Sequence, residues 1–193
     1  MDPKALAASA LIVVDMQRYF LERGAQAYLR PPRDLVPNVL GLVSAFRGAG
    51  RPVAFTRHAH LKKDPAGQMG RWWGGKLPRL GDPQSELIED LAPARGEPVI
   101  VKQRYSALER TRLEAWLRKR RVDTLVICGV MTNLCVETTA RHAFMREFQP
   151  VVVGDACAAG SAEFQSASLA NLAYGFALIA TAREVISSMR RRP

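Results

Sequence analysis

The chain has 193 residues, 48% of them hydrophobic and 24% charged, which predicts one globular domain over residues 1–193 and argues against a repeat or low-complexity protein. The net charge of +10 does not indicate a nucleic-acid partner, because the basic residues are scattered apart from the runs 118–121 and 190–192, and no nucleic-acid-binding motif surrounds them. No stretch reaches the ~18 apolar residues of a membrane helix, and three cysteines fit neither a disulfide framework nor a CxxC zinc site, so we expect a cytoplasmic protein with no membrane partner.

The first predicted element is a short buried strand over residues 9–15, which ends in the charged residue Asp15. The loop that follows contains Phe20 and no GxGxxG motif, which removes the main signature of a dinucleotide-binding enzyme. A helix over 34–47 comes next, ended by glycines at 48 and 50, and a second strand covers 52–56. An acidic side chain therefore lies at a strand end, with an aromatic side chain shortly after it.

Residues 57–83 form a long segment with little periodicity, and long loops in compact domains are usually functional or disordered. Adjacent Trp72 and Trp73 argue against disorder, because two large apolar rings are poorly suited to remain solvated. We interpret the segment as a lid over the substrate site, with at least one of these rings in contact with substrate. The alternative is that both rings only attach the loop to the surface.

His58 and His60 alternate in the same segment, so on an extended backbone both side chains point the same way. Two such histidines are compatible with a metal site, but no further histidine occurs until His142. We therefore expect no metal and no cofactor. His58 is predicted to line the pocket as a hydrogen-bonding group, and His60 to be structural or exposed.

A short helix over 85–91 is predicted before a third strand over 99–101, which is followed by Lys102. A lone lysine after a strand is usually a solvated charge, so its role depends on what lies beside it. Tyr105 follows at the same rim and is a further candidate for substrate contact. A helix over 110–120 then leads to the next strand, with Trp116 in its core stripe.

The central element runs from 122 to 148, where an apolar strand over 122–128 gives way to a helix. Thr132 is the expected N-cap, which would place Cys135 in the first helical turn, beside unpaired N–H groups and the positive end of the helix dipole. Such surroundings favour the thiolate and can lower a cysteine pKa from about 8.5 to roughly 3.5–7.5. Cys128, inside the strand, is expected to be a core residue.

The remaining elements alternate as strand 151–153, helix 161–174, strand 176–180 and helix 182–190, with Asp155 and Cys157 in structural roles. Alternating βα units predict a three-layer α/β domain, in which helices cover both faces of a six-stranded parallel sheet. In such a sheet the pocket lies beyond the carboxyl ends of the strands, so Asp15, Lys102 and Cys135 are expected to converge there. An acid, a base and a nucleophile would then share one cleft.

Four motifs occur in order along most of the chain: VVDMQRYF, VKQRYSAL, CGVMTNLCVETTARHA and VVVGDACAA. On these motifs the chain resembles the isochorismatase-like cysteine hydrolases, which include nicotinamidases and N-carbamoyl amide hydrolases. The resemblance implies the Rossmann-like sheet order 3-2-1-4-5-6 and a catalytic triad of Asp15, Lys102 and Cys135. It also implies a cis peptide bond between residues 130 and 131 and a substrate-facing Phe20. The motifs do not specify the substrate.

One position departs from this family. Nicotinamidases carry Asp-x-His at the place of His58 and His60, with further histidines downstream, and in this chain His58 replaces the aspartate. A zinc site at this place would lack ligands.

The resemblance implies hydrolysis of a C–N bond in a small amide or N-carbamoyl compound. Asp15 would take the thiol proton and later return it to the leaving amine, Lys102 would favour the charged states of its neighbours, and Cys135 would attack the carbonyl. Backbone N–H groups from Met131 to Cys135 would form the oxyanion hole, and water would then hydrolyse the thioester.

Two alternatives to an amidohydrolase stay open. The first is an isochorismatase-type vinyl ether hydrolase, although isochorismatases of this fold do without the cysteine. The second is a non-catalytic α/β binding protein. The presence of all three residues, Asp15, Lys102 and Cys135, argues against it.

Three arginines are expected at the mouth of the cleft. Arg57 follows the second strand, Arg71 lies in the lid, and Arg104 comes just after the lysine of the third strand. Guanidinium groups bind carboxylates in bidentate fashion, so we expect a substrate that carries a carboxylate, with aromatic side chains around its apolar part. We also expect a homo-oligomer, either a dimer or a tetramer.

Overall fold

The computed structural model describes residues 6–64 and 66–190, and within them six parallel strands form one sheet in the order β3-β2-β1-β4-β5-β6. This order confirms the one that the resemblance implied. Arg191 and Arg192 of the C-terminal basic run lie outside the described residues. The strands are β1 (Ser9–Val14), β2 (Val53–His58), β3 (Val99–Lys102), β4 (Thr124–Val130), β5 (Gln149–Ala158) and β6 (Leu178–Ala180).

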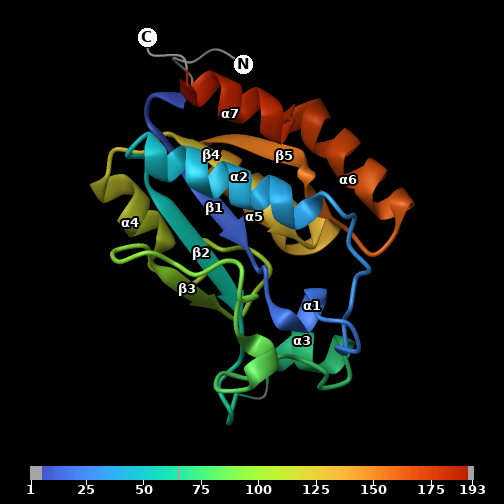
Figure 1. Ribbon diagram of the computed structural model, residues 1–193. Helices are drawn as coiled ribbons and strands as arrows, with labels where there is room; N and C mark the ends of the chain where they lie inside the picture. Colours follow the sequence, from blue (N-terminus) through green and yellow to red (C-terminus); the bar gives the residue numbers. More distant parts are fainter. Residues whose placement is uncertain (1–5, 65, 191–193) are drawn as a thin grey trace.

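Helices cover both faces of the sheet (Figure 1). On one face, α2 (Leu35–Gly48) and α7 (Ala182–Arg190) pack over β1, β4 and β5. On the other face lie α4 (Leu113–Lys119), α5 (Glu137–Met145) and α6 (Ala162–Gly175). The predicted three-layer architecture is confirmed.

The two central strands, β1 and β4, are buried along their whole length and pair in parallel from Ser9↔Thr124 to Val14↔Gly129. Gly129 has a φ of +114°, and a Cβ at this residue would lie 2.1 Å from the carbonyl oxygen of Val14. Only glycine therefore allows the two strands to approach this closely just before the turn that carries Cys135.

Two short helices, α1 (Arg18–Leu21) and α3 (Gly67–Trp72), lie beyond the carboxyl ends of β1 and β2 (Figure 1). Both belong to segments that leave the sheet and return to it. The described part of the long segment after β2 thus includes a helix, and it lies at the end of the sheet where parallel α/β folds form their pockets.

The predicted helix over 85–91 is wrong. The structure has only a three-residue 3₁₀ helix, η2 (Pro83–Ser85), whose first turn is capped by the Asp82 side chain. The residues after it instead bond to the segment following β1, through Arg18 N–H to Glu86 O at 3.0 Å and Ile88 N–H to Met16 O at 3.0 Å. These tertiary hydrogen bonds replace the helical ones.

Several predicted boundaries also shift. The strand predicted over 122–128 is β4 (Thr124–Val130), and the strand predicted over 151–153 is the longer β5 (Gln149–Ala158). β2 runs to His58 instead of ending at Thr56, so Arg57 and His58 lie within the strand. α4 begins at Leu113 because the Thr111 hydroxyl accepts from its N–H at 3.2 Å and donates to Ala107 O at 2.6 Å, which forms a turn before the helix.

No helix in the described part of the chain combines the length and the apolar character needed to span a membrane.

Candidate active site

Asp15, Lys102 and Cys135 meet at the carboxyl ends of β1, β3 and β4. Nζ of Lys102 lies 2.7 Å from Oδ2 of Asp15 and 3.2 Å from Sγ of Cys135. The ammonium also donates to the carbonyl oxygen of Arg104 at 3.1 Å. All three side chains are buried, so their charges interact with little screening by water.

Burial and charge set the protonation of this cluster. Burial alone would lower the pKa of Lys102, but the Asp15 carboxylate, together with the neighbouring sulfur of Cys135, outweighs it and raises that pKa. Burial raises the pKa of Cys135 to about 12; Lys102 opposes this rise and Asp15 adds to it. The predicted depression of the Cys135 pKa is therefore wrong, and Cys135 is a thiol in the resting protein.

The turn that carries Cys135 differs from the expected helix start. The peptide bond Val130–Met131 is cis, as the resemblance implied. A single π-helical turn, η3 (Thr132–Val136), follows, and α5 begins after it. Thr132 is not the N-cap; its hydroxyl donates to Oε1 of Gln165 at 2.6 Å. Cys135 thus lies in a π turn, a feature that often marks functional sites.

A side chain on β2 orients Asp15. Oγ1 of Thr56 donates to Oδ1 of Asp15 at 2.6 Å and accepts from the Asp15 backbone N–H at 3.1 Å. Asp15 has a φ of +48°, which is uncommon for a residue with a Cβ. Sequence reasoning missed Thr56, although its place near the end of a predicted strand beside the one that ends in Asp15 was an available signal.

Gln17 fixes the end of β2. Its Oε1 accepts from the His58 N–H at 2.8 Å, while its Nε2 donates to the carbonyl oxygens of His58 at 3.0 Å and Ser85 at 2.7 Å. A single buried carboxamide therefore joins three segments of the site. Sequence reasoning also missed this residue, although it belongs to the motif VVDMQRYF.

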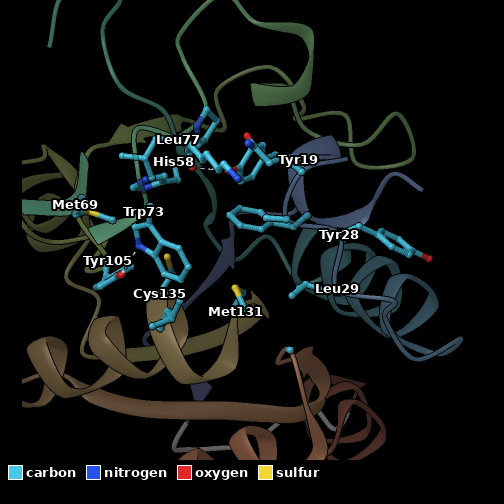
Figure 2. A pocket seen from close by; sticks show the side chains of 17 residues that line it. Tyr19, Tyr28, Leu29, His58, Met69, Trp73, Leu77, Tyr105, Met131 and Cys135 are labelled. Atoms are coloured by element: carbon cyan, nitrogen blue, oxygen red, sulfur yellow. Dashed lines mark hydrogen bonds between the residues drawn. The ribbon is translucent and has the colours of Figure 1, made fainter. Parts of the chain in front are cut away.

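A cavity of about 360 Å³ opens beside Cys135, within the size range of small-molecule sites. Figure 2 shows Trp73, His58 and Cys135 on one side of it and Tyr19, Tyr28 and Leu29 on the other. Its lining is mostly aromatic and apolar. The described lining residues are Tyr19, Phe20, Gln26, Ala27, Tyr28, Leu29, His58, Met69, Trp73, Lys76, Leu77, Pro78, Tyr105, Met131, Leu134, Cys135 and Gly160.

Most predicted substrate-contact residues line this cavity. Phe20, His58, Trp73 and Tyr105 do so, together with Met131 of the predicted oxyanion turn. Trp72 does not: it belongs to α3 and is 74% exposed. Trp73 follows as the C-cap of α3, and neighbouring residues at a helix end face in different directions, so only Trp73 lines the cavity.

Two tyrosines hold the lid segment to the body of the protein. Nε1 of Trp73 donates to the Tyr105 hydroxyl at 3.0 Å, and the Tyr19 hydroxyl donates to the carbonyl oxygen of Lys76 at 2.8 Å. Both hydrogen bonds join cavity-lining residues from distant parts of the sequence. The predicted lid thus corresponds to a segment held against the body of the protein, and Trp73 is its tryptophan that lines the cavity.

The three arginines expected at the mouth do not line the cavity. Arg57 forms an ion pair with Glu86 and borders a separate hollow, because β2 extends further than predicted. The guanidinium of Arg71 donates to Gln68, and that of Arg104 donates to the Gln103 carbonyl. Among the described lining residues Lys76 alone carries a charge, and it is exposed.

The residues around the two histidines do not fit a metal site. The His58 and His60 rings pack edge to face with centroids 5.2 Å apart, and Nδ1 of His60 contacts Oδ2 of Asp64 at 2.8 Å. No group of three or more His, Cys, Asp or Glu side chains within residues 6–64 and 66–190 is arranged to hold an ion. The donor set is thus short of the ligands that a zinc ion needs.

Comparison with known proteins agrees with the family resemblance that the sequence motifs indicated. The family model described as the isochorismatase domain matches residues 9–184. The chain is 38% identical to Nicotinamidase 3 of Arabidopsis thaliana, over 92% of this chain and 86% of that protein. It is 32% identical to the ureidoacrylate amidohydrolase RutB of Serratia proteamaculans, over 88% and 79%. The crystal structure of a cysteine hydrolase from Pseudomonas syringae pv. phaseolicola superposes with a TM-score of 0.91 at 33% identity, covering 98% of this chain and 94% of that one.

Proposed function

The chain belongs to the isochorismatase family, and from this premise we propose that it is a cysteine hydrolase that cleaves a small amide or N-carbamoyl compound through a thioester acyl-enzyme. Its relatives named nicotinamidase and ureidoacrylate amidohydrolase act on carbon–nitrogen bonds other than peptide bonds, and this chain is a hydrolase of the same class. The observation that carries the mechanism is the buried contact of Lys102 with both Asp15 and Cys135 at the wall of the cavity.

In the first step Sγ of Cys135 attacks the substrate carbonyl carbon, and the thiol proton passes to the carboxylate of Asp15. A thiol with a pKa near 12 is a weak nucleophile by itself, so proton removal must accompany attack. Lys102, held 3.2 Å from the sulfur, stabilises the negative charge that develops there. Backbone N–H groups of the turn from Met131 to Cys135 are the proposed donors to the tetrahedral oxyanion.

In the second step the tetrahedral intermediate collapses. The C–N bond breaks, the leaving amine takes the proton from Asp15, and the acyl group stays on the sulfur as a thioester. Water then adds to the thioester carbonyl with Asp15 again as base, and the C–S bond breaks to release the acid and restore the thiol. The net reaction for a primary amide is RCONH₂ + H₂O → RCOOH + NH₃.

The amidohydrolase proposal is tested by ammonia release from a panel of nicotinamide, pyrazinamide, N-carbamoyl amino acids and ureido acids. We expect at least one of them to be hydrolysed by the wild-type chain. If no compound in the panel is hydrolysed, the proposed function is contradicted.

The acyl-enzyme is tested by adding hydroxylamine to reactions with a primary amide and with the methyl ester of the same acid. Both substrates would give the same thioester, so the ratio of hydroxamate to free acid should be equal for the two. Different ratios would show that no common acyl intermediate forms and would contradict the thioester mechanism.

We further propose a homo-oligomer, a dimer or a tetramer, that acts in the cytoplasm. Support for the assembly comes from exposed apolar side chains around α5, α6 and β6, including Met145 at 75%, Tyr174 at 96% and Leu178 at 52% exposed. Burial of such a surface in a second copy would be favourable. Light scattering coupled to gel filtration tests the assembly, and a monomeric mass at micromolar concentration would contradict it.

A further inference from the structure

Residues 103–112 connect β3 to α4 without forming a helix or a strand, yet they supply one of the three groups around the Lys102 ammonium. Nζ of Lys102 lies 3.1 Å from the carbonyl oxygen of Arg104. Its other two partners are Oδ2 of Asp15 and Sγ of Cys135. An ammonium has three N–H donors, so these three groups satisfy it completely. The direction of the ammonium therefore depends on where the segment 103–112 places the Arg104 carbonyl.

Two side chains of α5 hold this segment at its centre. Oγ1 of Thr139 accepts from the Ala107 N–H at 2.9 Å. Nδ1 of His142 lies 2.9 Å from Oγ of Ser106, and the same hydroxyl accepts from the Leu108 N–H at 3.1 Å. Because no helix or strand fixes this part of the chain, its position relative to α5 depends on these side-chain hydrogen bonds.

The helix that provides these contacts directly follows the turn with the proposed nucleophile. Thr139 comes four residues after Cys135, and His142 three residues later, a spacing that places side chains on one side of a helix. Each of the three contacts a residue between 102 and 107. The element that carries the reactive sulfur therefore also braces the segment that directs the ammonium beside it. These contacts join two of the sequence motifs through residues to which the proposed mechanism gives no role.

We propose that Thr139 and His142 are positioning residues for Lys102. Through the segment 103–112 they fix the carbonyl oxygen of Arg104, which in turn keeps the lysine ammonium within reach of the reactive sulfur. The inference rests on the proposed function, because that function assigns the ammonium the task of stabilising charge on the sulfur. Neither Thr139 nor His142 lines the cavity, so both act through the lysine and not on the substrate.

The rate at which iodoacetamide alkylates Cys135 reports the position of the ammonium without any amide substrate. The thiolate attacks the methylene carbon, a C–S bond forms, and iodide leaves, while the thiol proton passes to solvent. Burial raises the pKa of Cys135 to about 12 and Lys102 opposes this rise. A displaced ammonium should therefore leave less thiolate at a given pH and slow the alkylation.

Thr139→Val keeps the shape of the side chain and removes the acceptor of the Ala107 N–H. At pH 9 we expect Cys135 to be alkylated about tenfold more slowly in this variant than in wild type, measured by mass spectrometry of the labelled peptides. Thr139→Ser keeps the hydroxyl and should restore the rate to within about twofold of wild type. Thr138→Val makes the same change at the neighbouring, half-buried residue, which takes no part in these contacts, and should leave the rate unchanged.

A purely structural role for Thr139 predicts a change of the opposite sign. If Thr139→Val only loosened the fold, the buried thiols would become more accessible to the reagent. Cys135 would then react faster, and the buried Cys128 and Cys157 would be labelled with it. Faster or unchanged alkylation of Cys135 in a folded Thr139→Val would overturn the inference.

His142 supplies a second test if Thr139→Val does not fold. His142→Leu removes the contact with Ser106 and should slow alkylation of Cys135 by about threefold or more, whereas His142→Asn keeps a polar group there and should restore part of the rate. A wild-type rate in a folded His142→Leu would overturn the inference.

Combining Thr139→Val with Lys102→Met tests whether the threonine acts through the lysine. Without the ammonium, loss of the hydroxyl should have no further effect on the alkylation of Cys135. A further tenfold slowing would show that Thr139 acts by another route, and the inference would be overturned.

The inference and the proposed function fail separately, because alkylation needs no amide. If the chain hydrolyses nothing in the amide panel but Thr139→Val slows alkylation, the proposed function is contradicted and the positioning role stands. If amides are hydrolysed and alkylation of the variant is unchanged, the proposed function stands and the inference is overturned.

Discussion

The hydroxyl of Thr56 and the carboxylate of Asp15 form a 2.6 Å hydrogen bond at the ends of two neighbouring strands. The same hydroxyl accepts from the Asp15 N–H at 3.1 Å, so both the main chain and the side chain of Asp15 are fixed. With Oδ1 engaged in this way, Oδ2 is directed to Lys102 at 2.7 Å. Thr56 is thus a positioning residue for the proposed base.

Thr56→Val, which has the same shape but no hydroxyl, should lower kcat about 10- to 100-fold, because small displacements of a catalytic group have effects of this size. KM should change little, since Thr56 does not line the cavity. Thr56→Ser keeps the hydroxyl and should recover most of kcat. Steady-state kinetics of the two variants provide the check. Equal kcat values for Thr56→Val and wild type would contradict the positioning role of Thr56.

Gly129→Ala tests the close approach of β1 and β4. The added Cβ would lie 2.1 Å from Val14 O, in a backbone conformation that alanine rarely adopts, so we expect unfolding to become easier by about 3 kcal/mol or more. Gly48→Ala is the matched control: it meets no atom within 4 Å and should change stability by no more than about 1 kcal/mol. Denaturant unfolding measures both. Similar stabilities for the two variants would contradict the packing argument.

Much of the fold was predictable because hydrophobic patterning and chain order constrain a parallel α/β sheet strongly. Apolar runs that stop at polar residues predicted the strands that end near Asp15 and Lys102. They also predicted the turn that contains Cys135. The helix over 85–91 was predicted wrongly because local propensity does not reveal tertiary hydrogen bonds such as Ile88 N–H to Met16 O.

The sequence motifs predicted which residues form the site, but they did not predict the burial and the charges around those residues. The motifs indicated Cys135, but its pKa depends on burial, which a sequence motif does not state, and burial raised that pKa instead of lowering it. The prediction that Arg57 lies at the mouth of the cleft was wrong because the strand before it is longer than predicted. Two more residues in β2 place Arg57 inside the strand, where it pairs with Glu86.

His58 should make stability depend on pH. Its pKa is about 3 in the folded protein and near 6.5 in the unfolded chain, so between these values the unfolded state binds about one proton more. The free energy of unfolding should therefore fall as pH decreases from about 6.5 towards 3, by up to about 1.4 kcal/mol per pH unit from this residue.

Denaturant titrations of wild type and His58→Gln at pH 7.5, 6, 5 and 4 measure this effect. The variant should show a shallower loss of stability below pH 6.5. At pH 7.5, above both values, the histidine is neutral in either state, which supplies the internal control. Parallel curves for the two proteins over the acidic range would show that His58 is not held in its neutral form.

Activity should survive exhaustive chelation, with kcat/KM within about twofold of the untreated protein. His58 and His60 lack the further ligands that a zinc ion needs, and His60 already contacts Asp64. Dialysis against a strong chelator, elemental analysis and an activity assay make the check. Stoichiometric zinc, with activity lost on chelation and restored by adding zinc back, would make this prediction wrong.

The most direct test of the account is ammonia release by Cys135→Ala and Cys128→Ala, measured on the amide that the wild-type chain hydrolyses best. Both thiols are buried, but Cys135 lines the cavity and Cys128 packs inside β4. Cys135→Ala should fold normally and lose at least about 10⁴-fold in kcat. Cys128→Ala should keep kcat within about twofold and lose about 1 kcal/mol of stability. Wild-type-like turnover by a folded Cys135→Ala would contradict the proposed mechanism.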